Sequence, residues 1–222
     1  MSAQLNTPQA VLFDLDGTLV DTADDLGAAL NHVLANFGKP RCYSEQYRPV
    51  ASHGAKGLLQ LGFGAEFASY DFALLRQMFL HYYAEHIAQH SQPFAGAVPL
   101  LQQLEQQQIP WGVVTNKPYK LAASLLRQLP ALANCRLLLG GDSLAQRKPD
   151  PTPLWVACQQ LTVDPRQCWY VGDAERDIEA GRRAGMQTVL AAFGYIANED
   201  QPELWQADLT ISSLAELQLH LG

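Results

Sequence analysis

Short apolar runs alternate with amphipathic stretches over the second half of the chain. The apolar runs cover residues 109–115, 136–139, 168–172, 188–192 and 209–211, and each predicts a short strand. The stretches 98–107, 118–129, 153–161, 175–184 and 214–219 carry apolar residues at helical spacing. Strands that are apolar throughout, rather than at every second position, are typical of a parallel sheet covered by helices on both faces. The pattern therefore predicts the α/β class.

The first half of the chain has a different pattern. Val11, Leu12 and Phe13 form one more apolar run, and we assign it to the same sheet because it has no other partner. Residues 22–91 predict several helices, with helical spacing in 26–37, 58–61 and 72–82 and an irregular polar segment at 41–48. We therefore predict an α/β core of residues 1–21 and 92–222, interrupted by a helical insertion of residues 22–91. Two crossings, near residues 20–21 and 92–96, join these units and predict hinge closure.

Composition and charge limit the classes of binding partner that we expect. The 222 residues are 48% hydrophobic and 17% charged, which is typical of a globular protein. The net charge is −7 and no Lys/Arg cluster exceeds two residues, so we expect no nucleic-acid partner. The four cysteines show no C-x-x-C spacing, and no apolar run reaches the length of a membrane span. We expect a cytoplasmic protein without a membrane partner, either a monomer or a weak homodimer.

Two acidic residues, Asp14 and Asp16, follow the first apolar run. Side chains alternate along a strand, so both carboxylates can point the same way and favour a bound cation. Gly17 then permits backbone torsions that other residues resist. Asp16-Gly17 between alternating apolar residues is also typical of a hairpin turn, and in that alternative interpretation residues 12–20 form a hairpin.

Polar side chains also follow the later predicted strands. In open α/β sheets, ligands bind beyond the carboxyl ends of the strands, so these side chains are expected at one edge of the sheet. They are Asp14 and Asp16 after the first strand, Thr115 and Asn116 after the second, Lys148 in the loop after the third, and Asp173 and Asp177 after the fourth.

The chemistry of this set suits a phosphate and a metal ion. Carboxylates such as Asp14, Asp16 and Asp173 are the hard oxygen ligands that Mg²⁺ prefers. Thr115 and Asn116 precede a predicted helix, whose N-terminus can bind an anion, and Lys148 adds a positive charge. We therefore expect Mg²⁺ and a small anionic phosphate ester at this edge.

The ordered set resembles the haloacid dehalogenase superfamily of phosphohydrolases. Its four motifs match Asp14-Leu15-Asp16-Gly17-Thr18, then Thr115 with Asn116, then Lys148 before Pro149, and finally Gly172-Asp173 with Asp177. Each motif alone is weak, but the four in this order cover most of the chain. The resemblance implies a Rossmann-like core with a helical cap inserted after the first strand.

The resemblance also implies roles. Asp14 would be the nucleophile that forms an aspartyl-phosphate, and Asp16 would protonate the leaving oxygen and then activate water. Thr115 and Asn116 would hold phosphate oxygens, while Lys148 would offset charge during transfer. Mg²⁺ would bind Asp14, Asp173 and the backbone carbonyl of Asp16.

Two of these roles have simpler alternatives. Asp177 would support the water shell of the metal or orient Lys148, but an acid at this position also merely favours a helix N-terminus. In the alternative interpretation of Lys148, it is an exposed loop lysine without a role in the reaction.

The acid at position 16 limits the type of reaction that we expect. Superfamily members that cleave carbon–halogen or phosphonate bonds lack an acid here, so Asp16 favours phosphate-ester hydrolysis. Two alternatives share the motifs. A phosphomutase of the β-phosphoglucomutase type has the same nucleophile but returns phosphate to a bound sugar. A non-enzymatic sensor would bind a phospholigand without needing Asp14 as a nucleophile.

The substrate is predicted from the insertion and from subfamily resemblance. Residues 52–57 are polar and rich in glycine, and we expect Lys56, with His53, to reach the substrate; the alternative is that both are solvated surface residues. The chain resembles phosphoglycolate phosphatases at Asp21-Thr22 and at residues 171–181. Residues 193–208 are similar to N-acetylmuramic acid 6-phosphate phosphatases. The expected substrate is therefore 2-phosphoglycolate or N-acetylmuramic acid 6-phosphate.

Overall fold

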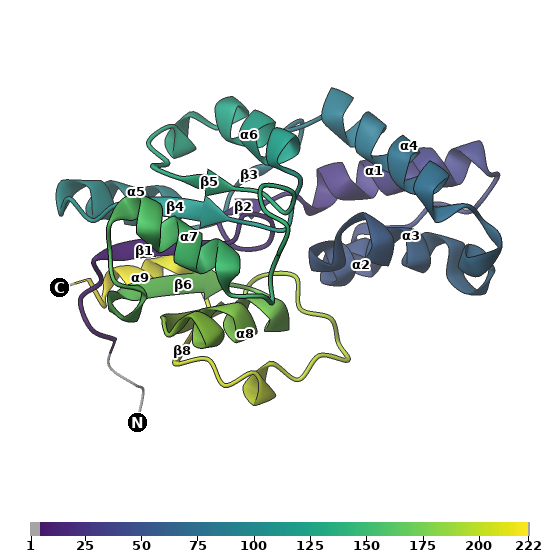
Figure 1. Cartoon of the computed structure of the whole chain (residues 1–222). Coiled ribbons are helices and arrows are strands. Elements are labelled where there is room, and N and C mark those ends of the chain that lie inside the picture. Colours follow the sequence, from purple (N-terminus) through teal and green to yellow (C-terminus); the bar gives the residue numbers. More distant parts are fainter. Residues whose placement is uncertain (1–4, 222) are drawn as a thin grey trace.

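A six-stranded sheet runs through the larger part of the molecule (Figure 1). The computed structural model describes residues 5–221, and its strands follow the order β5-β4-β1-β6-β7-β8 with every neighbouring pair parallel. The strands are β1 (Ala10–Phe13), β4 (Trp111–Val114), β5 (Leu138–Leu139), β6 (Cys168–Gly172), β7 (Gln187–Ala191) and β8 (Leu209–Ile211). The predicted α/β fold with a parallel sheet is confirmed, and the first apolar run lies at the centre of that sheet.

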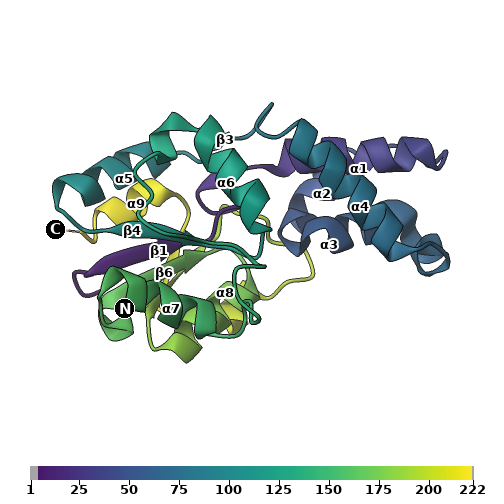
Figure 2. The same ribbon diagram turned by 45° about the horizontal axis from the view of Figure 1, so that its top comes forward.

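Helices cover both faces of the sheet, which is why the strands are apolar throughout (Figure 2). Val11 and Phe13 of β1 pack on one face, and Ala10 and Leu12 pack on the other. The first face is covered by α5 (Ala97–Gln106), α6 (Tyr119–Gln128) and α9 (Leu214–Gln218), and the second by α7 (Thr152–Leu161) and α8 (Glu175–Ala184). None of the described helices is long and apolar enough to cross a membrane.

The remaining helices form a group beside the sheet, which we call the helical unit (residues 22–91; Figure 1). Its elements are α1 (Ala23–Asn36), α2 (Ser44–Tyr47), the 3₁₀ helix η1 (Arg48–His53), α3 (Gly54–Phe63), the 3₁₀ helix η2 (Gly64–Ser69) and α4 (Phe72–Glu85). Leu30, Leu58 and Phe79 belong to a buried cluster formed mostly by this unit, which Tyr195 joins from the segment after β7. The prediction of an irregular segment at 41–48 is wrong in part, because α2 makes one helical turn there and buries Tyr47.

A small two-stranded sheet connects the helical unit to the rest of the chain. Its strands, β2 (Val20–Asp21) and β3 (Gln92–Pro93), are antiparallel. The alternative that residues 12–20 form a hairpin is wrong, because β1 pairs in parallel with β4 and β6, and Val20 pairs with Pro93. Asp14 and Asp16 therefore lie beyond the end of a central strand.

Candidate active site

Asp14 lies at the end of β1 beside the buried lysine Lys148. The Lys148 ammonium lies 3.1 Å from Asp14 Oδ1 and 2.7 Å from Asp177 Oδ1, and it donates to the Tyr170 hydroxyl at 2.7 Å. The ammonium therefore forms two ion pairs with buried carboxylates and one hydrogen bond with a hydroxyl. We call Asp14, Lys148, Asp177 and Tyr170 the Asp14 network. Lys148 is not the exposed loop lysine of the alternative interpretation, since its side chain is only 1% exposed.

The charge on Asp14 is set by two opposing effects. Burial is the largest single effect and raises the pKa of this carboxyl. The charges of Lys148 and Arg176, with hydrogen bonds from Thr115 and from the Leu15 amide, together outweigh it and lower the pKa. The Leu15 N–H donates to Asp14 Oδ1 at 2.7 Å. The pKa of Asp14 is therefore below its ordinary value, and the carboxylate is ionised although it is buried.

Asp177 both begins a helix and orients Lys148. Its Oδ2 accepts from the Ala174 N–H at 3.1 Å, close to the start of α8, and its Oδ1 faces the Lys148 ammonium. Oδ1 is buried, and within the described residues it forms this ion pair but no hydrogen bond of regular geometry. Gly172 allows this placement, because a Cβ there would lie 2.3 Å from the Asp177 Cβ.

Three buried carboxylates meet where the sequence predicts a metal ion. Asp14, Asp173 and Asp177 each offer an oxygen within 4.8 Å of the others. Burial, followed by the charges of Asp177 and Asp14, raises the pKa of Asp173 to about 7. A divalent cation would offset this repulsion, and the all-oxygen donor set together with the unbonded Asp177 Oδ1 fits Mg²⁺. The Asp16 carboxylate is not part of this group, while that of Asp177 is.

Asp173 is held by the sheet and by the helical unit. Its Oδ2 accepts from the Tyr195 N–H at 2.8 Å and from the Ser52 hydroxyl, in η1, at 2.6 Å. The Thr18 hydroxyl lies 3.4 Å from its Oδ1. Gly17 has φ +81°, and a Cβ there would lie 2.1 Å from Asp173 Oδ2. The glycine after Asp16 is therefore required both by its backbone conformation and by the approach of Asp173.

Asp16 has a different set of partners. Lys117 donates to Asp16 Oδ1 at 2.9 Å and to Oδ2 at 3.2 Å, and the Thr22 hydroxyl donates to Oδ1 at 2.6 Å. Lys117 also donates to the Tyr83 hydroxyl, on α4, at 2.9 Å. We call Asp16, Lys117, Thr22 and Tyr83 the Asp16 network. Lys117 is only 4% exposed and is absent from the predicted site, although it directly follows Thr115 and Asn116.

Thr115 and Asn116 lie at the expected edge but are used differently. The Thr115 hydroxyl hydrogen-bonds Asp14, as the lowered pKa of that carboxyl reflects, and it accepts from the Lys117 N–H at 3.2 Å. The Asn116 side-chain nitrogen donates to the Lys148 carbonyl at 3.0 Å. Asn116 therefore fixes the loop that carries Lys148. Its contact with phosphate stays a prediction.

A cleft of about 170 Å³ opens between the helical unit and the sheet, next to Asp173. His53 lines this cleft, whereas Lys56 does not and has an exposed side chain. Asp200 and Trp205, from the predicted substrate-related segment 193–208, line its other side. Sequence reasoning missed Arg176 here, although the residue lies within the fourth motif.

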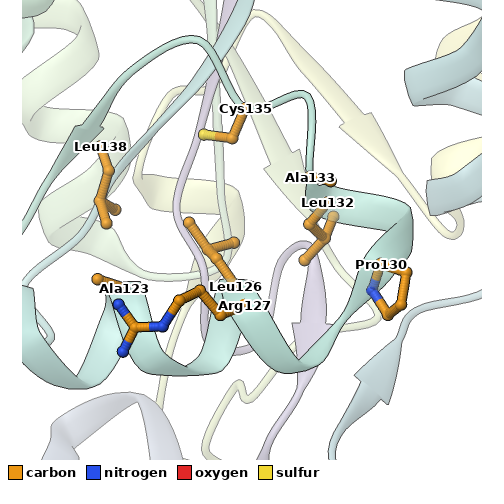
Figure 3. Close-up of a pocket in the computed structure, with 8 residues that line it drawn as sticks. All are labelled: Ala123, Leu126, Arg127, Pro130, Leu132, Ala133, Cys135 and Leu138. Atoms are coloured by element: carbon orange, nitrogen blue, oxygen red, sulfur yellow. The ribbon is translucent and has the colours of Figure 1, made fainter.

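A second hollow has no acidic lining. This groove of about 450 Å³ lies between α6 and β5 and is lined mostly by apolar side chains (Figure 3). Its polar members are Arg127 and Cys135. The groove contains none of the predicted site residues, so we place the candidate active site at the cleft beside Asp173.

Comparisons with known proteins show which proteins the chain is similar to. A family model described as haloacid dehalogenase-like hydrolase matches residues 11–191. A phosphoglycolate phosphatase of Xanthomonas campestris pv. campestris (strain 8004) is 45% identical over 210 residues, covering 95% of each chain. An N-acetylmuramic acid 6-phosphate phosphatase of Pseudomonas aeruginosa is 42% identical, covering 94% of this chain and 92% of that protein. The crystal structure of a predicted phosphoglycolate phosphatase from Haemophilus somnus 129PT matches with a TM-score of 0.85 at 28% identity, covering 96% and 97% of the two chains.

Proposed function

Because this chain belongs to the haloacid dehalogenase-like hydrolases, we propose that it is a Mg²⁺-dependent phosphatase acting on a small phosphate monoester through an aspartyl-phosphate. Membership of the family confirms the resemblance that the four motifs indicate. The observation that carries the proposal is the separation of Asp14 and Asp16 into two networks, each with its own lysine. Two acids that lie close together but in different surroundings can take different roles.

In the first step, an oxygen of the ionised Asp14 attacks phosphorus and the bond to the ester oxygen breaks. Asp16 donates a proton to that leaving oxygen, so the alcohol departs neutral. Lys148 and the Thr115 hydroxyl stabilise the phosphoryl oxygens during transfer, and we keep Asn116 as a further phosphate contact. Lys148 lies 3.1 Å from Asp14 Oδ1, and the Thr115 hydroxyl hydrogen-bonds Asp14.

In the second step, water attacks the phosphorus of the aspartyl-phosphate. Asp16 takes the proton from this water, the bond to Asp14 breaks, and inorganic phosphate is released with both acids restored. Lys117 and Thr22 hold the Asp16 carboxylate in place between the two proton transfers. Asp14 and Asp173, with Asp177 or the Asp16 carbonyl, would hold Mg²⁺, which would supply positive charge to the phosphoryl oxygens.

The substrate is proposed from the relatives and from the cleft. The relatives described above are named for two activities, on phosphoglycolate and on N-acetylmuramic acid 6-phosphate. We propose that this chain acts on one of these two compounds and that residues 22–91 act as a cap that selects it. His53 lines the cleft and supports this role. Lys56 does not line the cleft, so its proposed contact with substrate is supported by the sequence alone.

Phosphate release tests the proposal. The purified chain is given 2-phosphoglycolate and N-acetylmuramic acid 6-phosphate in parallel, with Mg²⁺ and with EDTA. We expect release from at least one compound with Mg²⁺, loss of release with EDTA, and background release by Asp14→Asn. Release from neither compound by a folded protein, or full turnover by Asp14→Asn, would reject the proposal.

A further inference from the structure

The cleft beside Asp173 has walls from three separate parts of the chain. Ser52 and His53 come from the helical unit, Arg176 comes from the first turn of α8, and Asp200 and Trp205 come from the segment after β7. The cleft adjoins the carboxylates at which phosphate chemistry is proposed, since Asp173 belongs to both. Its position suits the organic part of a phosphate ester, and the inference below rests on the proposed function.

Arg176 is the cation of this cleft. Its guanidinium lies 4.0 Å from Asp14 Oδ2, and its side chain is 21% exposed. Among the described residues it forms no hydrogen bond, although a guanidinium has five N–H donors. Guanidinium donors form a rigid fork that matches the two oxygens of a carboxylate. An anion in the cleft would therefore find free donors at Arg176.

The other two cations of the site are already engaged. Lys148 forms ion pairs with Asp14 and Asp177 and donates to the Tyr170 hydroxyl. Lys117 contacts Asp16 and Tyr83. A substrate with a second anionic group, besides the phosphoryl group that is transferred, has Arg176 as its available partner.

Asp173 attracts Arg176 by its charge, but the acids in the cleft lining accept their hydrogen bonds from other groups. Asp200 accepts from the Ala197 N–H at 2.9 Å, and Asp173 accepts from Tyr195 and Ser52. Glu175 is exposed to solvent, where it does not need a partner. No hydrogen bond to Arg176 is formed by any of them within residues 5–221.

We propose that Arg176 binds a carboxylate of the substrate, so that the cleft selects phosphate esters that also carry a carboxylic acid. The two candidate substrates differ greatly in size but share this chemistry, since one is a phosphorylated glycolate and the other a phosphorylated muramic acid. Arg176 is then a specificity residue that contacts the substrate outside the transferred group. The shared carboxylate explains how one site can resemble enzymes of both names.

Two matched substrate pairs test this assignment. The first pair is 2-phosphoglycolate and 2-hydroxyethyl phosphate, in which an alcohol replaces the carboxylate. The second is N-acetylmuramic acid 6-phosphate and N-acetylglucosamine 6-phosphate, which lacks the lactyl acid. kcat/KM is measured for wild type, Arg176→Met and Arg176→Lys, with Arg182→Met as the control because Arg182 is an exposed residue of the same helix.

The expected result is a difference between the members of one pair. Wild type prefers the carboxylated member, and Arg176→Met lowers kcat/KM for that member by about 10- to 100-fold, the range for a lost hydrogen bond to a charged group, mostly through KM. The partner without a carboxylate changes little, and Arg176→Lys loses less than Arg176→Met. The pair that shows this pattern identifies whether the acid is a short phosphorylated hydroxy acid or a lactyl sugar.

Three outcomes would overturn the inference. Equal loss for both members of a pair would place Arg176 on the phosphoryl group or on Asp14, and unchanged kinetics in Arg176→Met would remove it from binding. A wild-type enzyme that does not prefer the carboxylated member of either pair would also overturn the inference. Release from none of the four compounds by wild type would instead reject the proposed function, so the two failures are distinguishable.

Discussion

Asp14 and Asp16 are separated by one residue, yet their side chains belong to parts of the molecule that are built differently. The partners of Asp14 in the Asp14 network come from the sheet, one of its loops and α8: Tyr170, Lys148 and Asp177. The Asp16 network takes Lys117 from the loop after β4, but Thr22 and Tyr83 come from the helical unit. The network of Asp14 therefore uses only residues of the sheet, its loops and α8, whereas that of Asp16 depends on how the helical unit lies against them.

This difference in surroundings separates the residue for nucleophilic attack, Asp14, from the residue for proton transfer, Asp16. A nucleophile must keep a fixed position and charge, and the Asp14 network supplies both without the helical unit. An acid/base that works only when substrate is enclosed benefits from contacts that form at closure. We therefore expect changes in the helical unit to affect steps that use Asp16 and to leave the charge of Asp14 unchanged.

The junction between the two parts is also held by side chains. The Tyr195 hydroxyl accepts from the Thr22 and Ala23 N–H groups and donates to Asp21 Oδ1 at 2.8 Å. Arg48 of η1 forms an ion pair with Asp21 at 2.9 Å. The segment that follows β7 thus contacts the crossing where the helical unit begins, and Tyr195 also lies against Asp173 through its N–H.

The largest effects are expected at the two acids themselves. Asp14→Asn removes the nucleophile, and turnover should fall by about 10⁴-fold or more. Asp16→Asn should lower turnover of an alkyl phosphate by about 10²–10⁴-fold, the range for lost general acid–base catalysis. With p-nitrophenyl phosphate, whose leaving group needs no proton, the first step in Asp16→Asn should be close to normal in rapid-quench measurements. Equal defects in both variants on both substrates would contradict the two-network account.

A smaller effect is expected when the lysine of the Asp16 network is changed. Lys117→Met leaves Asp16 without its charged partner, and kcat should fall by about 10- to 100-fold, as expected for a lost hydrogen bond to a charged group. Lys117→Arg should restore part of the rate. Lys120→Met is the control, because Lys120 is a nearby exposed lysine. If KM rose while kcat stayed at the wild-type value, Lys117 would be a substrate contact and not a positioning residue.

Tyr83→Phe tests the contact made by the helical unit. It removes only the hydroxyl that accepts from Lys117, so kcat should fall by about 2- to 10-fold, which corresponds to a neutral hydrogen bond. Tyr82→Phe is the matched control, since the Tyr82 hydroxyl bonds no residue within the described part of the chain. Identical kinetics for the two variants would mean that the helical unit does not act on Asp16 through Tyr83.

The smallest expected effect concerns stability and Asp173. Burial and the neighbouring carboxylates raise the pKa of Asp173 from 3.8 to about 7, so the folded, metal-free protein binds a proton there that the unfolded chain has lost. This stabilising contribution is present at low pH and is lost as pH rises through about 7. The quantity to measure is the Tm of wild type minus the Tm of Asp173→Asn, both in EDTA. This difference should fall by several degrees between pH 5 and pH 8. A constant difference across this range would show that Asp173 does not titrate there.

The sheet and most of the Asp14 side of the site could be predicted because the information is local. A run such as Val11 to Phe13 indicates a buried strand, and parallel strands bring their carboxyl ends to one edge. Asp14, Lys148 and Asp173 lie at that edge, each directly after a strand or in the loop that follows one.

The Asp16 side could not be predicted in the same way. Tyr83 lies within a helix whose apolar spacing identifies it only as a core residue, and its contact with Lys117 depends on how two separately packed parts meet. The position of Arg176 in the sequence likewise does not indicate a binding role. That role follows only from the folded structure, in which Arg176 lines the cleft. The Ser52 contact with Asp173 has the same origin.

The central claim is that Asp14 carries the phosphoryl group, and trapping this intermediate tests it most directly. Asp16→Asn is mixed with p-nitrophenyl phosphate and Mg²⁺, quenched in acid within one turnover, digested and analysed by mass spectrometry. We expect a phosphoryl adduct on Asp14 that accumulates in Asp16→Asn and is absent from Asp14→Asn. Turnover without an adduct on Asp14, or an adduct on another side chain, would contradict it.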